Sequence, residues 1–260
     1  LYRGGNGFLA QEICGAANIF LLFFRKSYII VEMLSYLIEL LASFCAVVVV
    51  LTLHEFAHAY VAFRCGDPTP KWSGRLSLNP LRHFDPIGLI CFTLVGFGWA
   101  KPVAINPNNF RRYRLGMGLT ASAGVVMNYL SAFLFYPLLC VVVSYMPQIP
   151  FFYEFLRYLT GFLFAYSLSF FVFNLLPLYP LDGFRILDAA LKRKGKVYDF
   201  LYRYGQIILL ALIAESFLCD IFVRFGVWQM DNFNILGWFM RFATQYLGWP
   251  ITALWGLIPW

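Results

Sequence analysis

The residues with the clearest chemical signature are His54-Glu55-Phe56-Ala57-His58, near the end of a long apolar run. Positions four apart lie on one face of a helix, so His54 and His58 can present two imidazoles to one metal ion. Glu55 lies beside the first of them and is suited to accept a proton from a water molecule that the metal activates. The chain has only three histidines, and two belong to this motif. The spacing therefore predicts a metal site with a neighbouring catalytic carboxylate.

The composition places this motif in a membrane protein. Hydrophobic residues make up 61% of the 260 residues, and charged residues only 13%, whereas about a quarter is usual in soluble domains. Polar side chains satisfied inside a helix bundle are the alternative explanation of the motif. That alternative weakens in a membrane, because ionisable groups inside a span are costly and usually functional. The net charge of +7 does not indicate nucleic acid, since basic residues gather in cytoplasmic loops of membrane proteins.

The six cysteines are scattered and form no Cys-x-x-Cys pair. They lie at positions 14, 45, 65, 91, 140 and 219, mostly within apolar runs. Small buried hydrophobic side chains are the ordinary explanation of such positions. Cys65 follows His58 by seven residues, and we do not expect it to bind the metal.

The apolar runs predict an all-α polytopic membrane protein with about five transmembrane helices around the metal site. They cover residues 33–63, 116–146, 158–181, 206–223 and 235–259. The last run is the least regular, because Arg241, Gln245 and Pro250 interrupt it. We expect one intramembrane domain over 33–260, with its motif core at 33–190 and C-terminal helices at 206–260.

Residues 1–32 are predicted to be an N-terminal extension of unknown role. Their apolar piece, residues 19–24, ends at Arg25-Lys26 and is too short to span a bilayer. Met33 is a plausible natural start of the domain.

The distribution of basic residues predicts the orientation in the membrane. Fourteen of the twenty lie in the two loops 64–115 and 182–205, which the span count places on one side. That side is therefore expected to be cytosolic. At 1.5 Å per residue, His54 lies about 30 Å along a helix that starts near Leu34, in the cytosolic half of the membrane.

A third metal ligand is expected at the same depth, because a catalytic zinc usually has three protein ligands and a water. Asp182 follows a predicted span that ends at the cytosolic side. Pro177 and Pro180 break the helix before it, and Gly183 permits a turn after it. An N-cap for the helix predicted over 184–192 is the alternative role for Asp182, and the two roles can coexist on different oxygens.

Two asparagines lie inside predicted spans, Asn128 and Asn174. A buried amide needs a partner, so hydrogen bonding between helices is the ordinary explanation. Either side chain could instead bind a substrate carbonyl or stabilise its oxyanion. We take both as candidate substrate-binding residues.

The loop 64–115 is predicted to contain a small membrane-associated β-hairpin or re-entrant segment. Residues 75–79 and 101–106 alternate polar and apolar side chains, as strands do. Residues 85–99 between them are apolar but too short and glycine-rich for a span. An exposed strand edge there could present an extended peptide to the metal, and an interfacial lid without substrate contact is equally compatible. His83 is expected to be a structural hydrogen-bonding residue.

Four motifs together resemble the site-2 protease family of intramembrane zinc metalloproteases, in its short bacterial form without PDZ or CBS domains. The likeness covers about residues 33–190, and the family's usual Gly-Pro-x-x-Asn appears without its proline as Gly124-Val-Val-Met-Asn128. The four motifs are His54-Glu-Phe-Ala-His58, Asn79-Pro-Leu-Arg-His-Phe-Asp-Pro-Ile-Gly88, Gly98-Trp-Ala-Lys-Pro-Val-Ala-Ile-Asn106 and Asn174-Leu-Leu-Pro-Leu-Tyr-Pro-Leu-Asp-Gly183. The resemblance implies Zn²⁺ held by His54, His58 and Asp182, with Glu55 as the catalytic carboxylate.

The expected function is therefore a zinc metalloendopeptidase of the cell membrane, with its active site toward the cytosol. It would cleave peptide bonds in or near transmembrane segments of other membrane proteins, in regulated intramembrane proteolysis. Its partners would be such substrates and the lipid bilayer, with no nucleic acid, while the oligomeric state is not predicted. The alternatives are a membrane metal transporter or sensor, and an inactive protease-like scaffold.

Overall fold

The computed structural model describes residues 6–95 and 101–260, with side chains from residue 30 onward except 92, 93 and 95. Four helices in this part of the chain are long and apolar enough to cross a membrane. They are α1 (Asn6–Arg64, with Ile30–Arg64 as the candidate span), α4 (Tyr113–Tyr145), α5 (Phe152–Leu175) and α7 (Lys196–Arg224). The shorter helices are α2 (Thr69–Trp72), α3 (Pro86–Val95), α6 (Asp182–Ala190) and α8 (Ile235–Trp255), with 3-10 turns η1 (Pro80–Arg82), η2 (Pro107–Asn109) and η3 (Trp228–Phe233).

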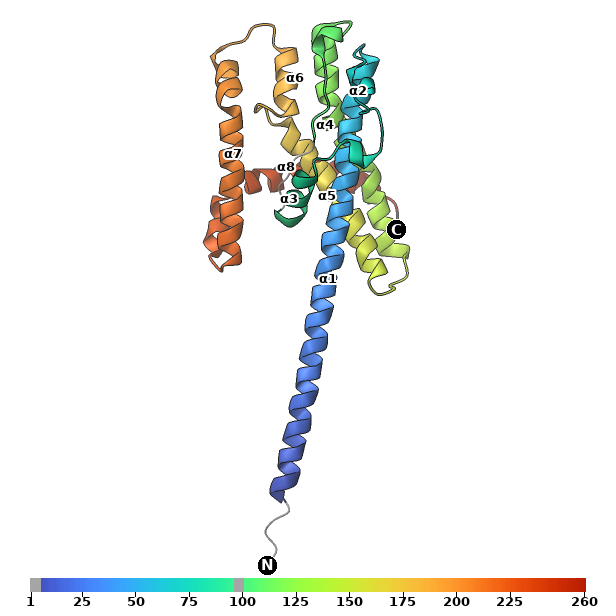
Figure 1. Cartoon of the computed structure of the whole chain (residues 1–260), viewed down its shortest axis with the longest axis vertical. Helices are drawn as coiled ribbons and strands as arrows, with labels where there is room; N and C mark the ends of the chain where they lie inside the picture. Colours follow the sequence, from blue (N-terminus) through green and yellow to red (C-terminus); the bar gives the residue numbers. More distant parts are fainter. Residues whose placement is uncertain (1–5, 96–100) are drawn as a thin grey trace, which may run out of the picture.

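Helices α1, α4 and α5 pack on one another and form the core of the bundle (Figure 1). Small side chains at their contacts, such as the fully buried Ala46 on α1 and Ala132 on α4, let the backbones approach closely. Around Ala46, the buried Val50 and Leu163 form one apolar cluster. The three helices thus give a rigid support to the C-terminal half of α1, where the His-Glu-x-x-His motif lies.

The fifth predicted span is not confirmed, because α8 is not among the candidate spans in the described residues. Pro250 lies inside this helix, and in Figure 1 it runs across the bundle instead of along it. It packs against α5, α7 and α4. The all-helical prediction is otherwise confirmed, with four candidate spans where about five were expected.

The predicted β-hairpin is not supported, because no strand is found among residues 6–95 and 101–260. Residues 75–79 and 101–106 are irregular, and a hydrogen bond from the Arg75 side chain to the Lys101 carbonyl (3.2 Å) joins the two regions. Prolines at 80, 86, 102 and 107 remove backbone donors that a paired strand needs. Residues 86–95 of the apolar piece form α3, which packs on α1, while residues 96–100 lie outside the described part.

Side-chain to backbone bonds hold the irregular loop in place of strand pairing. Arg75 is buried and donates to the carbonyls of Arg82 and Lys101. His83 is fully buried and its Nε2 donates to the Ser77 carbonyl at 2.6 Å, in keeping with its predicted structural role. Asp67, just beyond α1, accepts hydrogen bonds from the backbone N–H of Asn106 and the side chain of Asn109. The loop is therefore anchored to the end of α1.

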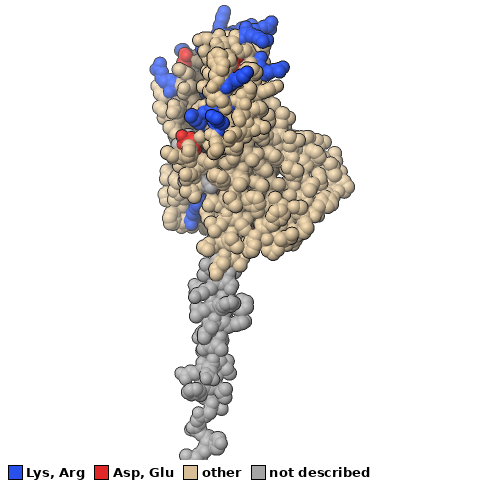
Figure 2. All heavy atoms as spheres, turned by 45° about the vertical axis from the view of Figure 1, so that its right-hand side comes forward, with Lys and Arg blue, Asp and Glu red and all other residues tan. Residues whose placement is uncertain are grey.

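Basic side chains gather at one end of the molecule (Figure 2). This is the end at which α2, α6 and the start of α4 lie in Figure 1, in agreement with the basic character of loops 64–115 and 182–205. At the opposite end, α1 continues without a break from Asn6, so the expected boundary near Met33 is not marked by a change of secondary structure. The separate role of residues 1–32 stays a prediction.

Candidate metal centre

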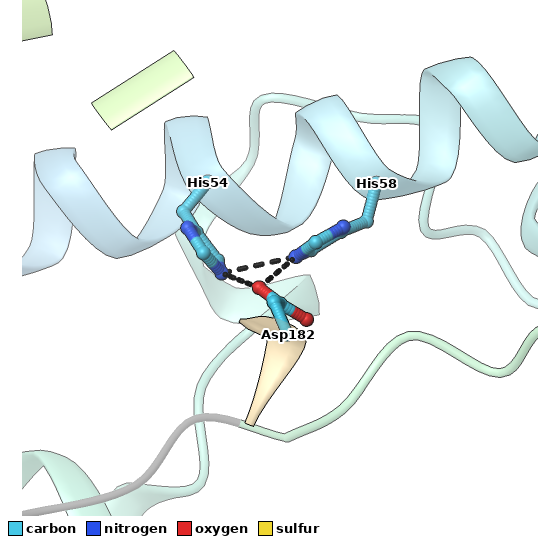
Figure 3. A group of neighbouring side chains, drawn as sticks. All are labelled: His54, His58 and Asp182. Carbon is cyan, nitrogen blue, oxygen red and sulfur yellow. Dashed lines mark hydrogen bonds and ion pairs between the residues drawn. The ribbon is translucent and has the colours of Figure 1, made fainter. Parts of the chain in front are cut away.

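Three side chains from two helices converge on one point between α1 and α6 (Figure 3). His54 and His58 lie one turn apart on α1, and their Nε2 atoms are 3.0 Å apart. The Oδ2 atom of Asp182, the first residue of α6, lies 3.3 Å from the Nε2 of His54 and 3.0 Å from that of His58. All three residues are buried. The convergence of a distant carboxylate on both imidazoles is the arrangement that the sequence predicted.

The chain reaches this arrangement because α5 ends just before Asp182. Leu175 is the last residue of α5, and Pro177 and Pro180 prevent the helix from continuing. Gly183 then packs α6 against the end of α5, since a Cβ on it would lie 2.3 Å from the Leu175 carbonyl oxygen. Leu181 occupies the N-cap position without a side-chain bond. The N-cap alternative for Asp182 is therefore wrong, and its carboxylate faces the imidazoles.

Helix α4 contacts the two imidazoles from behind. The Nδ1 of His58 lies 2.7 Å from the Thr120 carbonyl oxygen, and the Nδ1 of His54 lies 3.0 Å from the amide of Asn128. Between these residues, a Cβ on Gly124 would lie 2.3 Å from the Nε2 of His58. Only glycine therefore lets the α4 backbone lie against both rings.

The donor set and its spacing fit a zinc ion. Four tetrahedral ligands about 2.0–2.1 Å from zinc stand roughly 3.3 Å from one another, close to the 3.0–3.3 Å that separates the three atoms here. The Oδ2 of Asp182 is buried and makes no hydrogen bond within the described chain. A carbonyl can only accept, so His58 carries its hydrogen on Nδ1 when neutral and turns a lone pair toward Asp182. A shared cation relieves the repulsion between such lone pairs.

The charge of Asp182 suits this role. Burial alone would raise the pKa of its carboxyl group, but without a metal the positive charge of a protonated His58 and hydrogen bonds from His54 and His58 outweigh burial and hold the pKa well below its usual range. The group is therefore ionised at neutral pH, as a metal-ligating carboxylate must be. Arg185, one turn further along α6, lies 4.0 Å from the other carboxylate oxygen and adds a more distant positive charge.

A cavity of about 450 Å³ opens beside the three converging residues. Glu55 lines it together with His54, His58 and Asp182, so the candidate proton acceptor faces the same space. Most of the remaining wall is apolar and comes from α1, α5, α7 and the loop 101–105. Its apolar residues are Leu51, Pro102, Val103, Ile105, Phe170, Phe173, Pro180, Leu181, Leu209, Leu210 and Ile213. A smaller cavity of about 230 Å³ shares His58, Val103, Ile105 and Arg185 with it.

The two candidate asparagines occupy different surroundings. Asn174 lines the larger cavity and donates from Nδ2 to the Phe170 carbonyl at 3.1 Å. Asn128 is fully buried behind His54 and is not part of the cavity wall. Its position favours a role toward His54 over contact with a substrate.

Sequence reasoning missed the contributions of Thr120, Gly124 and Arg185. A signal for the first two exists in the spacing. Thr120, Gly124 and Asn128 are four residues apart on α4, as His54 and His58 are on α1. Small or polar residues that repeat every four positions on a neighbouring span lie on one face of it, and that face can contact the two histidines. Arg185 follows Asp182 by three residues, which places both on one face of α6.

Comparisons with known proteins agree with this geometry. A model of a protein family described as "Peptidase family M50" matches residues 146–212, which include Asn174 and Asp182 but not the His-Glu-x-x-His motif. "Putative zinc metalloprotease YwhC" of Bacillus subtilis is 44% identical over 142 residues, which are 54% of this chain and 65% of that protein. "Putative zinc metalloprotease Rip2" of Mycolicibacterium smegmatis is 27% identical over 201 residues, 75% of each chain. The chain thus spans a little less than two thirds of YwhC. No solved structure matches.

Proposed function

We propose that this chain is a zinc metalloendopeptidase of the site-2 protease type acting inside the membrane, in keeping with its match to the model of peptidase family M50 and its similarity to a putative zinc metalloprotease. The observation that carries the proposal is the convergence of His54, His58 and Asp182 beside Glu55 in one cavity. The proposed substrates are transmembrane segments of other proteins, cleaved in regulated intramembrane proteolysis. His54, His58 and Asp182 are the proposed zinc ligands.

Glu55 is the proposed general base. Zinc, when bound, supplies a Lewis acid that lowers the pKa of water and polarises a peptide carbonyl. The Glu55 carboxylate accepts the proton that the attacking water loses, and later returns it to the departing amine nitrogen. Neighbouring positions on a helix face different directions, so Glu55 points away from the cluster of proposed ligands although it is next to His54. It still lines the cavity, where it can accept a proton.

The cavity fits an unwound apolar peptide better than an intact helix. Its largely apolar wall would bury the side chains of a membrane segment, while a helix would keep its carbonyls hydrogen-bonded and out of reach. Asn174 lies on this wall, and we propose that its amide binds a substrate carbonyl. Arg185 lines both cavities and lies 4.0 Å from the Oδ1 of Asp182.

The protein is a multi-pass membrane protein with four candidate spans. We propose that the end carrying α2 and α6 faces the cytosol, since the loops 64–115 and 182–205 hold most of the basic residues. The gathering of basic side chains at one end in Figure 2 supports this orientation. Water would then reach the metal centre by a short route from the cytosolic side.

A metal transporter is the main rival, and the structure argues against it. Such a protein needs further polar groups on a path across the membrane, and Glu215 and Asp220 on α7 were the candidates. Glu215 accepts from the Ile235 N–H at 3.1 Å, and Asp220 accepts from the Asn234 side chain at 3.2 Å. Both side chains therefore stabilise the connection between α7 and α8. The second rival, an inactive scaffold, does not need a carboxylate in the cavity, whereas Glu55 lines the cavity here.

The substitution Glu55→Gln tests the proposal. Purified wild-type protein should contain about one zinc per chain and cleave a model transmembrane substrate in detergent or liposomes. E55Q should keep its zinc and lose cleavage by at least about 100-fold, because general-base catalysis contributes 10²–10⁴-fold. Full activity of E55Q would contradict the proposed role of Glu55 as general base. Zinc binding without any cleavage by the wild type would favour a sensor or scaffold.

A further inference from the structure

We propose that α4 sets the hydrogen positions of both histidine ligands and that Asn128 is a positioning residue for His54. In this inference, which rests on the metal site of the proposed function, the amide oxygen of Asn128 accepts the Nδ1 hydrogen of His54. The Nε2 lone pair is thereby directed at the metal. Asn128 contacts His54, is fully buried, and has no place in the cavity wall.

His58 shows how α4 does this. Its Nδ1 lies 2.7 Å from the Thr120 carbonyl oxygen, which accepts a hydrogen bond and cannot donate one. The hydrogen of the neutral ring is therefore on Nδ1, and Nε2 carries the lone pair next to Asp182. A ligand histidine whose second nitrogen donates to a carbonyl or carboxylate is held in one tautomer and one orientation.

His54 needs the same arrangement and finds a different partner. Its Nδ1 lies 3.0 Å from Asn128 Nδ2, while Asn128 Oδ1 is buried and has no hydrogen-bond partner in the described chain. Amide nitrogen and oxygen have nearly the same shape, so a half-turn of the amide exchanges them without disturbing the packing. The half-turn breaks no bond of Oδ1 and brings that oxygen to the Nδ1 hydrogen. Only this orientation leaves a lone pair on His54 Nε2 for a metal.

The register of the two helices explains why both partners come from α4. His58 pairs with Thr120 and His54 with Asn128, so the two helices run in opposite directions, and the partners lie two turns apart on α4. Gly124 lies between the pairs, where a Cβ would be 2.3 Å from His58 Nε2 and 2.6 Å from His54 Cε1. The helix thus acts as one rigid support for both rings, with Asn128 as its only side-chain contact to a ring nitrogen among the hydrogen bonds described.

The test compares two substitutions of nearly equal shape in the full chain. Asn128→Leu removes the acceptor, and Asn128→Asp keeps an acceptor and removes the amide donor. Zinc affinity is measured by competition with a chelator, and the absorption spectrum of the Co²⁺-loaded protein reports ligand geometry. Ser131→Ala, another buried polar residue on α4, is the matched control. The thermal midpoint of each metal-free protein shows whether it folds, and Asn128→Ala replaces the leucine variant if that variant does not.

We expect N128L to bind zinc about 10- to 100-fold more weakly, as loss of such a supporting contact typically costs, with an altered Co²⁺ spectrum. N128D should bind within about threefold of the wild type or more tightly, since carboxylates commonly support ligand histidines. S131A should be unchanged. Equal zinc affinity in N128L and the wild type would overturn the inference, as would an equal loss in N128L and N128D.

These outcomes are separate from those of the proposed function. A wild-type protein that binds zinc but cleaves nothing would contradict the protease and leave the role of Asn128 intact. A protease whose zinc affinity does not depend on Asn128 would contradict only the positioning role.

Discussion

The two sides of the metal centre differ in how closely they are packed. On the α4 side, backbone and side chains contact both imidazoles directly, and Gly124 leaves no room for even a methyl group. On the opposite side, α7 lines the cavity with Leu209, Leu210 and Ile213 and packs mainly on η3 and α8. In the apolar stretch of each candidate span, 33% of the residues are buried in α1 and 28% in α4, but only 11% in α7. In Figure 1, α7 stands apart from the bundle.

The difference corresponds to two physical requirements. A metal site needs ligands held within a fraction of an ångström, and close packing on α1, α4 and α6 provides this. A substrate that arrives through the lipid needs a wall that can be displaced at low cost, and a sparsely packed helix is such a wall. We therefore expect substitutions on the α4 side to change zinc affinity, and substitutions on the α7 side to change cleavage alone.

The largest effect should follow from Gly124→Ala. The added methyl group would overlap His58 Nε2 and His54 Cε1, so either the rings or α4 must move, and zinc affinity should fall by at least about 100-fold. Chelator competition measures it. Gly161→Ala on α5 is the matched control, because a Cβ there meets nothing within 4 Å. If G124A bound zinc as tightly as G161A, the close packing of the α4 side would have no role in metal binding.

A smaller effect, on cleavage only, should follow from Ile213→Trp. Ile213 lines the cavity on the α7 side, and the larger ring would fill space that a substrate needs. Cleavage of a transmembrane substrate should fall about tenfold, the cost of excluding a few apolar contacts, while zinc affinity stays unchanged. Leu218→Trp, on an exposed part of the same helix away from the cavity wall, should leave both unchanged. A loss of zinc in I213W would show that α7 also supports the ligands.

The convergence of His54, His58 and Asp182 was predictable because its main features are local in the sequence. The four-residue spacing of His54 and His58 needs only a helix, and the prolines before Asp182 explain why a span ends there. The pairing of α4 with α1 is a tertiary fact, and it decides that Asn128 contacts His54 while Asn174 faces the cavity. A buried asparagine in a span can bond to a neighbouring helix or bind a substrate, and the sequence alone does not distinguish these roles.

The two expectations that the structure does not confirm, the β-hairpin and the fifth span, also depend on contacts between segments distant in the sequence. Alternation in 75–79 and 101–106 predicted strands, but prolines and buried side chains such as Arg75 and Asp67 bond the backbone instead. The apolar run 235–259 predicted a span, although its Pro250 and its packing across α5 and α7 give a different helix. Apolar content establishes that a segment avoids water, and it does not establish the direction in which the segment runs.

The smallest effect concerns the loop that covers the cavity between the two sides. Pro102, Val103 and Ile105 lie on the cavity wall, and Asn106, the next residue, donates its N–H to Asp67 Oδ2 at 2.7 Å. Asp67→Asn removes the charge and one acceptor, which typically weakens such a contact by about 1 kcal/mol. We expect about a threefold loss of cleavage at unchanged zinc affinity. Thr69→Val, which removes one hydroxyl donor to the same carboxylate, should lose less.

The pH dependence of the same contact gives an independent check. Burial alone would raise the pKa of Asp67, but hydrogen bonds from Thr69, Asn109 and Asn106 outweigh it and lower the pKa below its usual value. A lowered pKa in the folded state means that the stabilisation is complete above the unfolded pKa of about 3.9 and is lost as pH falls through the folded value. The difference in thermal midpoint between metal-free wild type and D67N should therefore stay constant from about pH 7 to pH 5 and shrink below about pH 4. A difference that already shrank between pH 7 and pH 5 would mean that Asp67 takes up its proton near neutral pH and that the loop is held by other contacts.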